Sequence, residues 1–413
     1  MTIELSPVKN GYAATGRAFE AIAKRHPELA AFRRDLHANP EIGFQEHYTS
    51  QQVISALKVC GVDDIVTGLG KTGVVAVIKG KTNTQNDMVA LRADMDALPM
   101  QEMGDCAWKS KTTGMMHGCG HDGHTAMLLG AVQYLAATRH FDGTAVCIFQ
   151  PGEEGFAGAK AMMDDGLFER FPVREVYAIH NSPETQAGVI GVTQGPMQAA
   201  ADKFKIVVSG RGGHGARPHN CIDPVLVAAH IITAVQSIAS RNINTADPVV
   251  LSICALQAGD LAAFSVIPKD VTMVGTVRTY RPEVQEEVIR RITLVCESVA
   301  AGFGASAEVS YERVYPATIN TILQAQFVGD VAAGLVGEDR VLRNMPASMG
   351  AEDFSFMLQK IPGAYIRVGQ GTEETFKQGW FLHNPRYDFN DDILPLGAAL
   401  YASLIEKAMP LCT

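Results

Sequence analysis

The chain has 413 residues, of which 47% are hydrophobic and 19% are charged. This composition is typical of a soluble globular protein of two to three domains and excludes a largely disordered chain. The formal net charge of −9 and the absence of a Lys/Arg-rich run argue against binding to nucleic acids or to anionic membranes.

Helical spacing and apolar runs predict the elements of the first half of the chain. Residues 16–60 carry the spacing of helices, with a break at Asn39-Pro40-Glu41. Strands then alternate with helices up to about residue 180. The expected strands are 74–78, 88–91, 145–149 and 176–179, and the expected helices are 126–137 and 159–167. This alternation predicts a largely parallel, doubly wound α/β sheet.

The pattern changes near residue 190, where the expected order becomes strand, helix, strand, strand, helix, strand. The βαββαβ order is that of a ferredoxin-like module. The helix and strand alternation returns after about residue 320. We therefore predict a catalytic domain formed by residues 1–190 and 316–413, interrupted by a lid or dimerisation domain of residues 191–315.

The cysteines and the hydrophobic runs indicate the cellular compartment in which the protein is expected. Eight cysteines are scattered without the spacing of a disulfide framework, and Cys147 and Cys254 lie in apolar runs typical of reduced core thiols. The N-terminal residues contain no apolar signal-like stretch, and no segment reaches about 18 consecutive apolar residues. We expect a cytoplasmic protein.

The segment 116–124, with the sequence MHGCGHDGH, holds one thiol, three imidazoles and one carboxylate. Such groups are the usual ligands of Zn²⁺ and similar ions, and the glycines allow the turns that bring them together. We expect Cys119 and His121 to bind metal. We interpret His117 and His124 as residues that support the ligands or begin the helix.

Further reactive groups follow predicted strands, and in open α/β sheets ligands gather at the carboxyl ends of strands. One shared metal site is therefore expected there. Its predicted ligands are Cys119, His121, Glu154, His180 and His383, with Asp94 behind them. For Asp94 and Asp96 two roles stay open, since one could orient a ligand while the other caps a loop.

Five ligands are too many for one zinc ion, which takes three protein groups and a water at a catalytic site. They suit two ions about 3.5–4 Å apart. Cys119 could bridge both ions, with His121 and His180 on one ion and Glu154 and His383 on the other. The thiolate favours Zn²⁺ over Mg²⁺ or Ca²⁺, while Mn, Co and Ni are alternatives.

The pair Glu153-Glu154 suggests that one carboxylate binds metal while its neighbour acts as a general base. We assign Glu154 as the ligand and Glu153 as the base. In the Gly-rich segment 209–219, His214 could donate to a developing oxyanion, and Arg278 could hold a substrate carboxylate. The alternatives are a structural histidine in a glycine turn and a surface arginine on a strand.

Three other functions have some support in the sequence. The segment GLGKTG at 68–73 resembles a phosphate-binding loop but lacks the required first glycine and precedes a strand. Cys119 could also act as a nucleophile. A module that only binds metal would not need the additional carboxylate of Glu153.

Several segments together resemble one known family. They are RRDLH (33–37), LRADMDALP (91–99), MHGCGHDGHT (116–125), FQPGEEG (149–155), GRGGHGARPH (210–219), GAEDFS (350–355) and LHNP (382–385). Their order resembles the aminoacylase/carboxypeptidase clan of di-metal peptidases, and within it the hippurate hydrolases and the auxin-conjugate (IAA-amino acid) amidohydrolases. The match covers nearly the whole chain.

The resemblance implies a zinc-peptidase-like domain with a ferredoxin-like lid that also dimerises, and hydrolysis of small N-acyl amino acids to a carboxylic acid and a free amino acid. It implies the same five ligands, Glu153 as the base, and His214 and Arg278 as groups that contact substrate, His214 in some relatives from the partner subunit. A dipeptidase or carboxypeptidase with the same site is the alternative. Ser265 departs from the family, which commonly has Asn there, so substrate positioning by this residue is expected to differ.

Overall fold

The computed structural model describes residues 12–411, and these fall into two compact units. One unit contains the chain up to Met197, Ile319–Pro346 and the residues from Asp353 onward. The other consists of Gln198–Thr318 and the short segment Ala347–Glu352. The sequence pattern did not predict that this short segment belongs to the second unit. That the second unit works as a lid or dimerisation domain stays a prediction.

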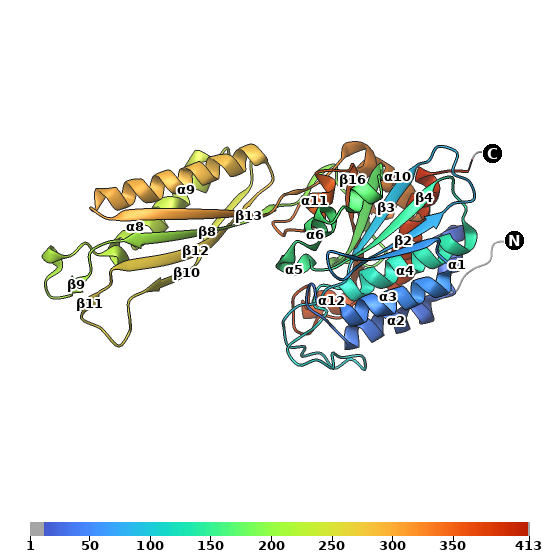
Figure 1. The fold of residues 1–413 in the computed structure, drawn as a ribbon, viewed down its shortest axis with the longest axis horizontal. Coiled ribbons are helices and arrows are strands. Elements are labelled where there is room, and N and C mark those ends of the chain that lie inside the picture. Colours follow the sequence, from blue (N-terminus) through green and yellow to red (C-terminus); the bar gives the residue numbers. More distant parts are fainter. Residues whose placement is uncertain (1–11, 412–413) are drawn as a thin grey trace. The chain divides into compact units, whose positions relative to one another are not determined.

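The first unit is built around an eight-stranded sheet with the order β1-β2-β4-β3-β5-β16-β6-β15 (Figure 1). Its strands are β1 (Asp64–Leu69), β2 (Gly73–Lys79), β3 (Met88–Asp94), β4 (Thr144–Gln150), β5 (Glu175–Gln186), β6 (Ile190–Gly191), β15 (Val341–Leu342) and β16 (Gly363–Gly371). The four central strands β4, β3, β5 and β16 are parallel. Strands β1 and β2 run antiparallel to their neighbours, so the sheet is mixed at its edges.

Helices cover both faces of this sheet, because the buried side chains of each strand alternate between two cores. In β2, Val74 and Ala76 join one core, whereas Val75 and Val77 join the other. The first core also contains α1 (Arg17–Ala23), α2 (His26–Ala38), α3 (His47–Cys60), α4 (His121–Thr138), α10 (Ile322–Val336) and α13 (Leu394–Ala408). The second contains α6 (Gly158–Asp164), α7 (Leu167–Arg170) and α11 (Phe354–Leu358). The doubly wound α/β prediction is confirmed.

Two predicted helices have different bounds. Helix α4 begins at His121, five residues before the apolar run, because its polar first turn is buried along with the rest of the helix. The expected helix 159–167 ends at Asp164, and Gly166, at a φ of 87°, separates it from α7. A run of apolar residues marks the middle of a helix better than its polar ends.

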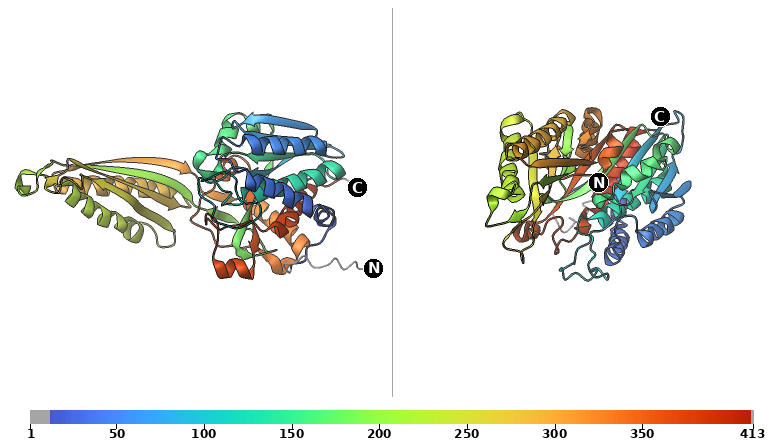
Figure 2. Two further views of the ribbon diagram at one scale, coloured as in Figure 1. Left: turned by 90° about the horizontal axis from the view of Figure 1, so that it is seen from below. Right: turned by 60° about the vertical axis from the view of Figure 1, so that its left-hand side comes forward.

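The second unit has a four-stranded antiparallel sheet with the order β10-β12-β8-β13. Its elements follow in the order β8 (Ala200–Ser209), α8 (Pro224–Ser237), β10 (Val249–Ala258), β12 (Asp270–Thr279), α9 (Pro282–Gly302) and β13 (Ser306–Tyr315). Both helices pack on one face of the sheet (Figure 2). This is the βαββαβ arrangement.

The two cysteines that the sequence assigned to the core differ in burial. Cys147 is buried in β4, but Cys254 is exposed on the edge strand β10. The assignment of Cys254 as a core thiol is therefore wrong.

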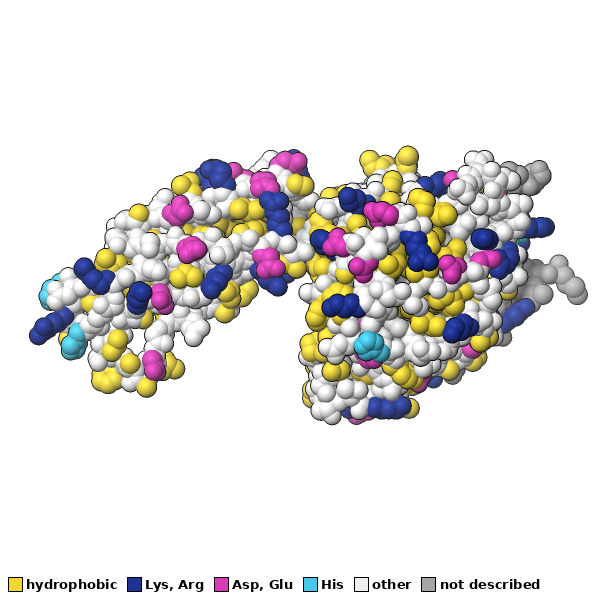
Figure 3. Space-filling model, viewed as in Figure 1, with side chains coloured by type: hydrophobic (Ala, Val, Ile, Leu, Met, Phe, Trp, Pro, Cys, Tyr) yellow, Lys and Arg dark blue, Asp and Glu magenta, His cyan; other side chains and the backbone are white. Residues whose placement is uncertain are grey.

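One helical segment, Pro224–Asn242, is long and apolar enough to cross a membrane by length and composition. Its residues Val227, Ile231 and Val235 pack in the core of the second unit, so its apolar character has a structural explanation. On the face shown in Figure 3, acidic and basic side chains are interspersed. The cytoplasmic location stays a prediction.

The buried Asp202 of β8 makes the stability of the second unit depend on pH. Tyr311 and Gln285 donate to its Oδ2 atom at 2.6 and 2.7 Å, whereas Oδ1 has no hydrogen-bond partner among the described residues. Burial raises the pKa of this carboxyl above its ordinary value. The folded state therefore binds the proton more tightly than the unfolded state, and stability falls as the pH rises above the ordinary Asp range.

We expect Asp202→Asn to increase the protection of β8 and β12 at pH 7 and to bring a smaller gain near pH 4, because the amide carries no charge to bury. Hydrogen–deuterium exchange of peptides from both strands, corrected for intrinsic rates, measures this effect. Asp270→Asn replaces an exposed acid of the same sheet and should leave protection unchanged at both pH values. Equal or lower protection of Asp202→Asn at pH 7 would contradict the assignment.

Candidate metal centre

The central strands bring the predicted site residues to one edge of the first unit. Asp94 is the last residue of β3, and Glu153 begins α5 (Glu153–Phe156), three residues after β4 ends. His180 comes from β5, which lies beside β3. His180 was expected just after a strand, but it lies inside β5 because the strand continues to Gln186 along β16.

All five predicted ligands come together in two overlapping groups. Cys119, His121 and His180 form one group, and Cys119, Glu154 and His383 form the other. Within each group the potential ligand atoms lie within 4.8 Å of one another. Cys119 belongs to both groups, which is the geometry that a bridging thiolate between two ions requires.

Two potential ligand atoms are buried without forming a hydrogen bond to any described residue. His121 Nε2 and Glu154 Oε1 lack a hydrogen-bond partner among residues 12–411. Glu154 Oε1 lies 3.2 Å from His383 Nε2, without the geometry of a hydrogen bond. Since a buried polar atom without a hydrogen bond costs about 1–3 kcal/mol, this donor set fits divalent cations.

The surrounding charges also favour a cation. Burial lowers the pKa of His121, but the neighbouring Asp94 and Cys119 outweigh it and raise that pKa well above its ordinary value. Burial raises the pKa of the Cys119 thiol to about 12, with a further contribution from Glu154. Positive charge is therefore stabilised here, and a thiolate forms only when a cation compensates it.

His180 is arranged as a neutral ligand. Burial lowers its pKa well below the ordinary value, and the neighbouring His124 ring lowers it further. Its Nδ1 atom lies 2.7 Å from the carbonyl oxygen of Asn181, to which it donates. The lone pair of Nε2 is then directed toward Cys119 Sγ, which lies 3.4 Å away.

Asp96 rather than Asp94 contacts two of the predicted ligands. Asp96 Oδ1 lies 3.2 Å from His121 Nδ1, and Asp96 Oδ2 accepts the backbone N–H of Glu154 at 2.9 Å. Such a carboxylate fixes the orientation of a ligating histidine. Asp94 bonds instead to His124 Nδ1 at 2.6 Å and to Arg92 at 2.8 Å, and lies 3.8 Å from His121 Nε2.

Glu153 lies beside the predicted ligands. It is only 7% exposed, and its carboxylate oxygen, with His121 and Glu154, forms another group of potential ligand atoms within 4.8 Å. The left-handed glycines Gly152 and Gly155, with φ of 62° and 86°, turn the backbone on either side of the two glutamates. A tight turn therefore brings two adjacent carboxylates to the same group of potential ligand atoms.

The sequence did not single out the buried network behind Glu153. Arg92 donates to Gln150 and Asp353 at 2.8 and 3.0 Å. Asp353 accepts the backbone N–H of Ala159 at 2.8 Å, and its own N–H lies 3.4 Å from Glu153 Oε1. The available signal was an arginine within the apolar strand β3, because a buried guanidinium requires acidic partners.

The remaining site residues belong to the second unit. His214 lies in β9 (Gly213–His214), which pairs with β11 (Val266–Ile267), and the carbonyl of Ser265 accepts the N–H of Gly215 at 2.7 Å. His214 is exposed, and its Nδ1 accepts the N–H of Ala216 at 3.2 Å, so the proton of the neutral ring is on Nε2. Arg278 lies on β12 and donates to Thr276 and to the carbonyl of Val277.

A parallel sheet with Cys, His and Glu side chains gathered at one edge is typical of metal-dependent hydrolases. The chain belongs to peptidase family M20/M25/M40, whose model matches residues 90–407. The resemblance to di-metal peptidases and hippurate hydrolases is thereby confirmed.

Known relatives cover nearly the whole chain. An N-acetylcysteine deacetylase from Bacillus subtilis is 38% identical over 92% of this chain and 96% of its own length. A hippurate hydrolase from Campylobacter jejuni is 39% identical over 92% of this chain and 96% of its own. A Bacillus subtilis crystal structure, described as a dinuclear metal binding peptidase from the M20 family, has a TM-score of 0.80 and 34% identity, covering 94% of this chain and 99% of that one.

The turn between Cys119 and His121 depends on Gly120, which has a φ of 93°. A Cβ atom there would lie 2.7 Å from both Asn181 Oδ1 and the Tyr387 hydroxyl. We expect Gly120→Ala to destabilise the protein by roughly 3 kcal/mol or more, through backbone strain and a buried clash together.

Urea denaturation of Gly120→Ala and of a matched variant, Gly61→Ala, measures this difference. Gly61 also has a positive φ of 67°, but a Cβ atom there meets nothing within 4 Å. Strain alone should cost Gly61→Ala about 1–2 kcal/mol. Equal losses in the two variants would show that the packing around Gly120 does not constrain the turn.

Proposed function

We propose that this protein is a metal-dependent amidohydrolase that cleaves N-acyl amino acids to a carboxylic acid and a free amino acid. The observation that carries the proposal is the convergence of five metal-ligating side chains on a shared Cys119, with the additional carboxylate of Glu153 beside them. The names of the deacetylase and the hippurate hydrolase support the same reaction class.

Two divalent ions would be held at this site. Cys119, His121 and His180 would hold one ion, and Cys119, Glu154 and His383 the other. Bound ions of this kind acidify a water and polarise a carbonyl oxygen. The thiolate and imidazole ligands favour Zn²⁺, with Mn²⁺, Co²⁺ and Ni²⁺ as alternatives.

Glu153 would act as the general base. It would take a proton from the attacking water and return it to the nitrogen of the leaving amino acid. Asp353 is held by Arg92 and Gln150 at 2.8–3.0 Å, and it stabilises the segment that carries Glu153. Of the two aspartates left open by the sequence, we assign the orientation of His121 to Asp96, while Asp94 would act through its bond to His124 and its charge near His121.

The second unit would supply the groups that contact substrate. His214 would donate its Nε2–H to the oxyanion, and Arg278 would bind the substrate carboxylate. Ser265 directly precedes β11, whose Val266 pairs with His214, so its backbone lies close to this donor. Either the same chain or a second copy in a homodimer would provide the loop. No nucleic-acid or membrane partner is proposed.

A dipeptidase or carboxypeptidase is the second candidate, because the family and the described M20 structure carry the name peptidase. Both reactions break an amide bond beside an amino-acid carboxylate. They differ in the group on the other side of the bond, which is an acyl chain in one case and a charged amino terminus in the other.

Replacing Glu153 by Gln tests the general base. We expect Glu153→Gln to lower kcat by roughly 100- to 10,000-fold, because the amide cannot accept the proton, while bound metal stays unchanged. Glu169→Gln, at a solvent-exposed position of α7, is the control and should keep full turnover. Turnover of Glu153→Gln within a few-fold of the unmodified enzyme would remove Glu153 from this role.

Metal reconstitution with a substrate panel tests the reaction class. Chelator-treated protein should release no amino acid, and added Zn²⁺, Mn²⁺, Co²⁺ or Ni²⁺ should restore release from N-acetyl- and N-benzoyl-amino acids. Dipeptides should be cleaved more slowly. Faster dipeptide cleavage would establish the peptidase alternative, and turnover without metal would point to Cys119 as a nucleophile.

A further inference from the structure

A second group of potential metal ligands lies in the first unit and shares no residue with the five described above. It contains His37 of α2, Cys106 of the loop after β3, and Asp388 near the C-terminus. Their ligand atoms lie within 4.8 Å of one another. Glu102 adds a fourth group, since its Oε1 lies 3.6 Å from Cys106 Sγ and 3.5 Å from His37 Nε2.

His37 is positioned as a ligand. Its side chain is fully buried, and its Nδ1 lies 2.9 Å from Asp122 Oδ2. Asp122 is held in turn by Arg33 at 3.3 Å. His37 Nε2 faces Glu102 and has no hydrogen-bond partner within the described part of the chain. A histidine whose Nδ1–H is held by a carboxylate presents Nε2 in the manner of metal-bound histidines.

The charges around the cluster favour a cation. Burial raises the pKa of the Cys106 thiol to about 12, and the carboxylates of Asp388 and Glu102 contribute to this increase. Burial lowers the pKa of His37, but Asp122 and Glu102 outweigh it and raise the pKa to about 9. Surroundings that retain a proton on His37 would also stabilise a metal ion in its place.

Positive groups near the cluster offset only part of this charge. Arg33 lies 3.4 Å from Asp388 Oδ1, the same oxygen that accepts the indole N–H of Trp108 at 3.1 Å. Arg33 also donates from Nε to Asp391 Oδ1 at 2.7 Å. Glu102 instead faces His37 Nε2 at 3.5 Å and accepts the N–H of Ser110 at 2.7 Å.

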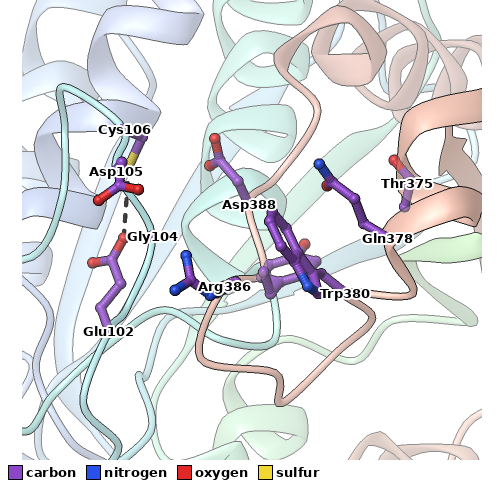
Figure 4. A pocket seen from close by; sticks show the side chains of 10 residues that line it. Glu102, Gly104, Asp105, Cys106, Thr375, Gln378, Trp380, Arg386 and Asp388 are labelled. Atoms are coloured by element: carbon purple, nitrogen blue, oxygen red, sulfur yellow. Dashed lines mark hydrogen bonds between the residues drawn. The ribbon is translucent and has the colours of Figure 1, made fainter.

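An ion can reach the cluster from solvent. Glu102, Cys106 and Asp388 line a pocket of about 280 Å³, which Arg386 and Trp380 also border. In Figure 4 the Glu102 and Cys106 side chains meet on one wall of this pocket, and Asp388 comes from the opposing segment. His37 is fully buried, and its Nε2 lies 3.5 Å from the Oε1 atom of Glu102, which lines the pocket.

We propose that His37, Cys106 and Asp388, with Glu102 as the fourth ligand, bind one Zn²⁺-type ion separate from the metal pair. Thiolate, imidazole and carboxylate are zinc ligands, and tetrahedral ligands at ~2.0–2.3 Å from zinc lie about 3.5 Å apart. Separations of up to 4.8 Å therefore require side chains to move inward by about 1 Å. The ion would join α2, the loop after β3 and the segment that carries His383.

Metal stoichiometry tests this site. Protein is stripped with chelator, equilibrated with Zn²⁺ at a buffered low-micromolar level, and analysed for bound zinc per chain. Cys106→Ala should bind one equivalent less than the unmodified protein. Cys254→Ala removes an exposed cysteine of the second unit and should bind the same amount as the unmodified protein. Equal zinc in all three proteins would overturn the proposal, whatever the occupancy of the metal pair.

Alkylation gives a second measurement that resolves individual cysteines. Iodoacetamide labelling, followed by mass mapping of peptides, should slow at least about tenfold at Cys106 when Zn²⁺ is present, because the metal-bound thiolate is no longer available. Labelling of Cys254 should not change. Unchanged labelling of Cys106 would exclude it as a zinc ligand, and neither readout depends on turnover.

Discussion

The burial of Arg92 is the constraint on which the arrangement of the first unit depends. This guanidinium is fully buried in the central strand β3, and it donates to Asp94, Gln150 and Asp353 at 2.8–3.0 Å. A buried charge is tolerated only when its partners are complete, and removing one partner typically costs about 3–5 kcal/mol. Arg92 therefore fixes β3, the end of β4 and a segment some 200 residues later in the chain at the same point.

Both sides of the metal centre are attached to this point. On one side, Asp94 holds His124, whose Nε2 lies 2.7 Å from Asn181 Oδ1 beside His180. On the other side, Asp353 accepts the N–H of Ala159 and lies next to Glu153. Each of these acidic groups is held by donors of its own. Between them, His121 Nε2 and Glu154 Oε1 are buried without a hydrogen bond among the described residues, and divalent cations would compensate these atoms.

The sequence pointed to the side chains that the structure brings together here, because each lies in a short motif near a strand. The loop 116–124 and the pair Glu153-Glu154 show their chemistry locally, and the rule for parallel strands brings them to one edge. It did not predict contacts between distant segments. Asp96 could be distinguished from Asp94 only by its distance to His121, and Asp353 only by its contact with Arg92. The group of His37, Cys106 and Asp388 spans most of the chain, and no single motif contains more than one of its members.

The start of α4 shows the same limit in one element. Its apolar run begins at Ala126, but the helix begins at His121, because folding buries polar side chains that form hydrogen bonds within the site. The spacing of apolar residues indicates which side chains are buried because they are hydrophobic. It does not report polar residues that are buried because a partner or a bound ion satisfies them.

The two units contribute different chemistry to the proposed reaction. The first unit holds buried groups whose positions are fixed by hydrogen bonds. The second presents His214 on the short pair β9 and β11, where the Ala216 N–H on Nδ1 leaves Nε2–H as the donor. A donor whose tautomer is fixed before substrate binds stabilises an oxyanion without reorganisation. In the proposed reaction this donor would serve the oxyanion, while the buried groups of the first unit would serve the ions and the attacking water.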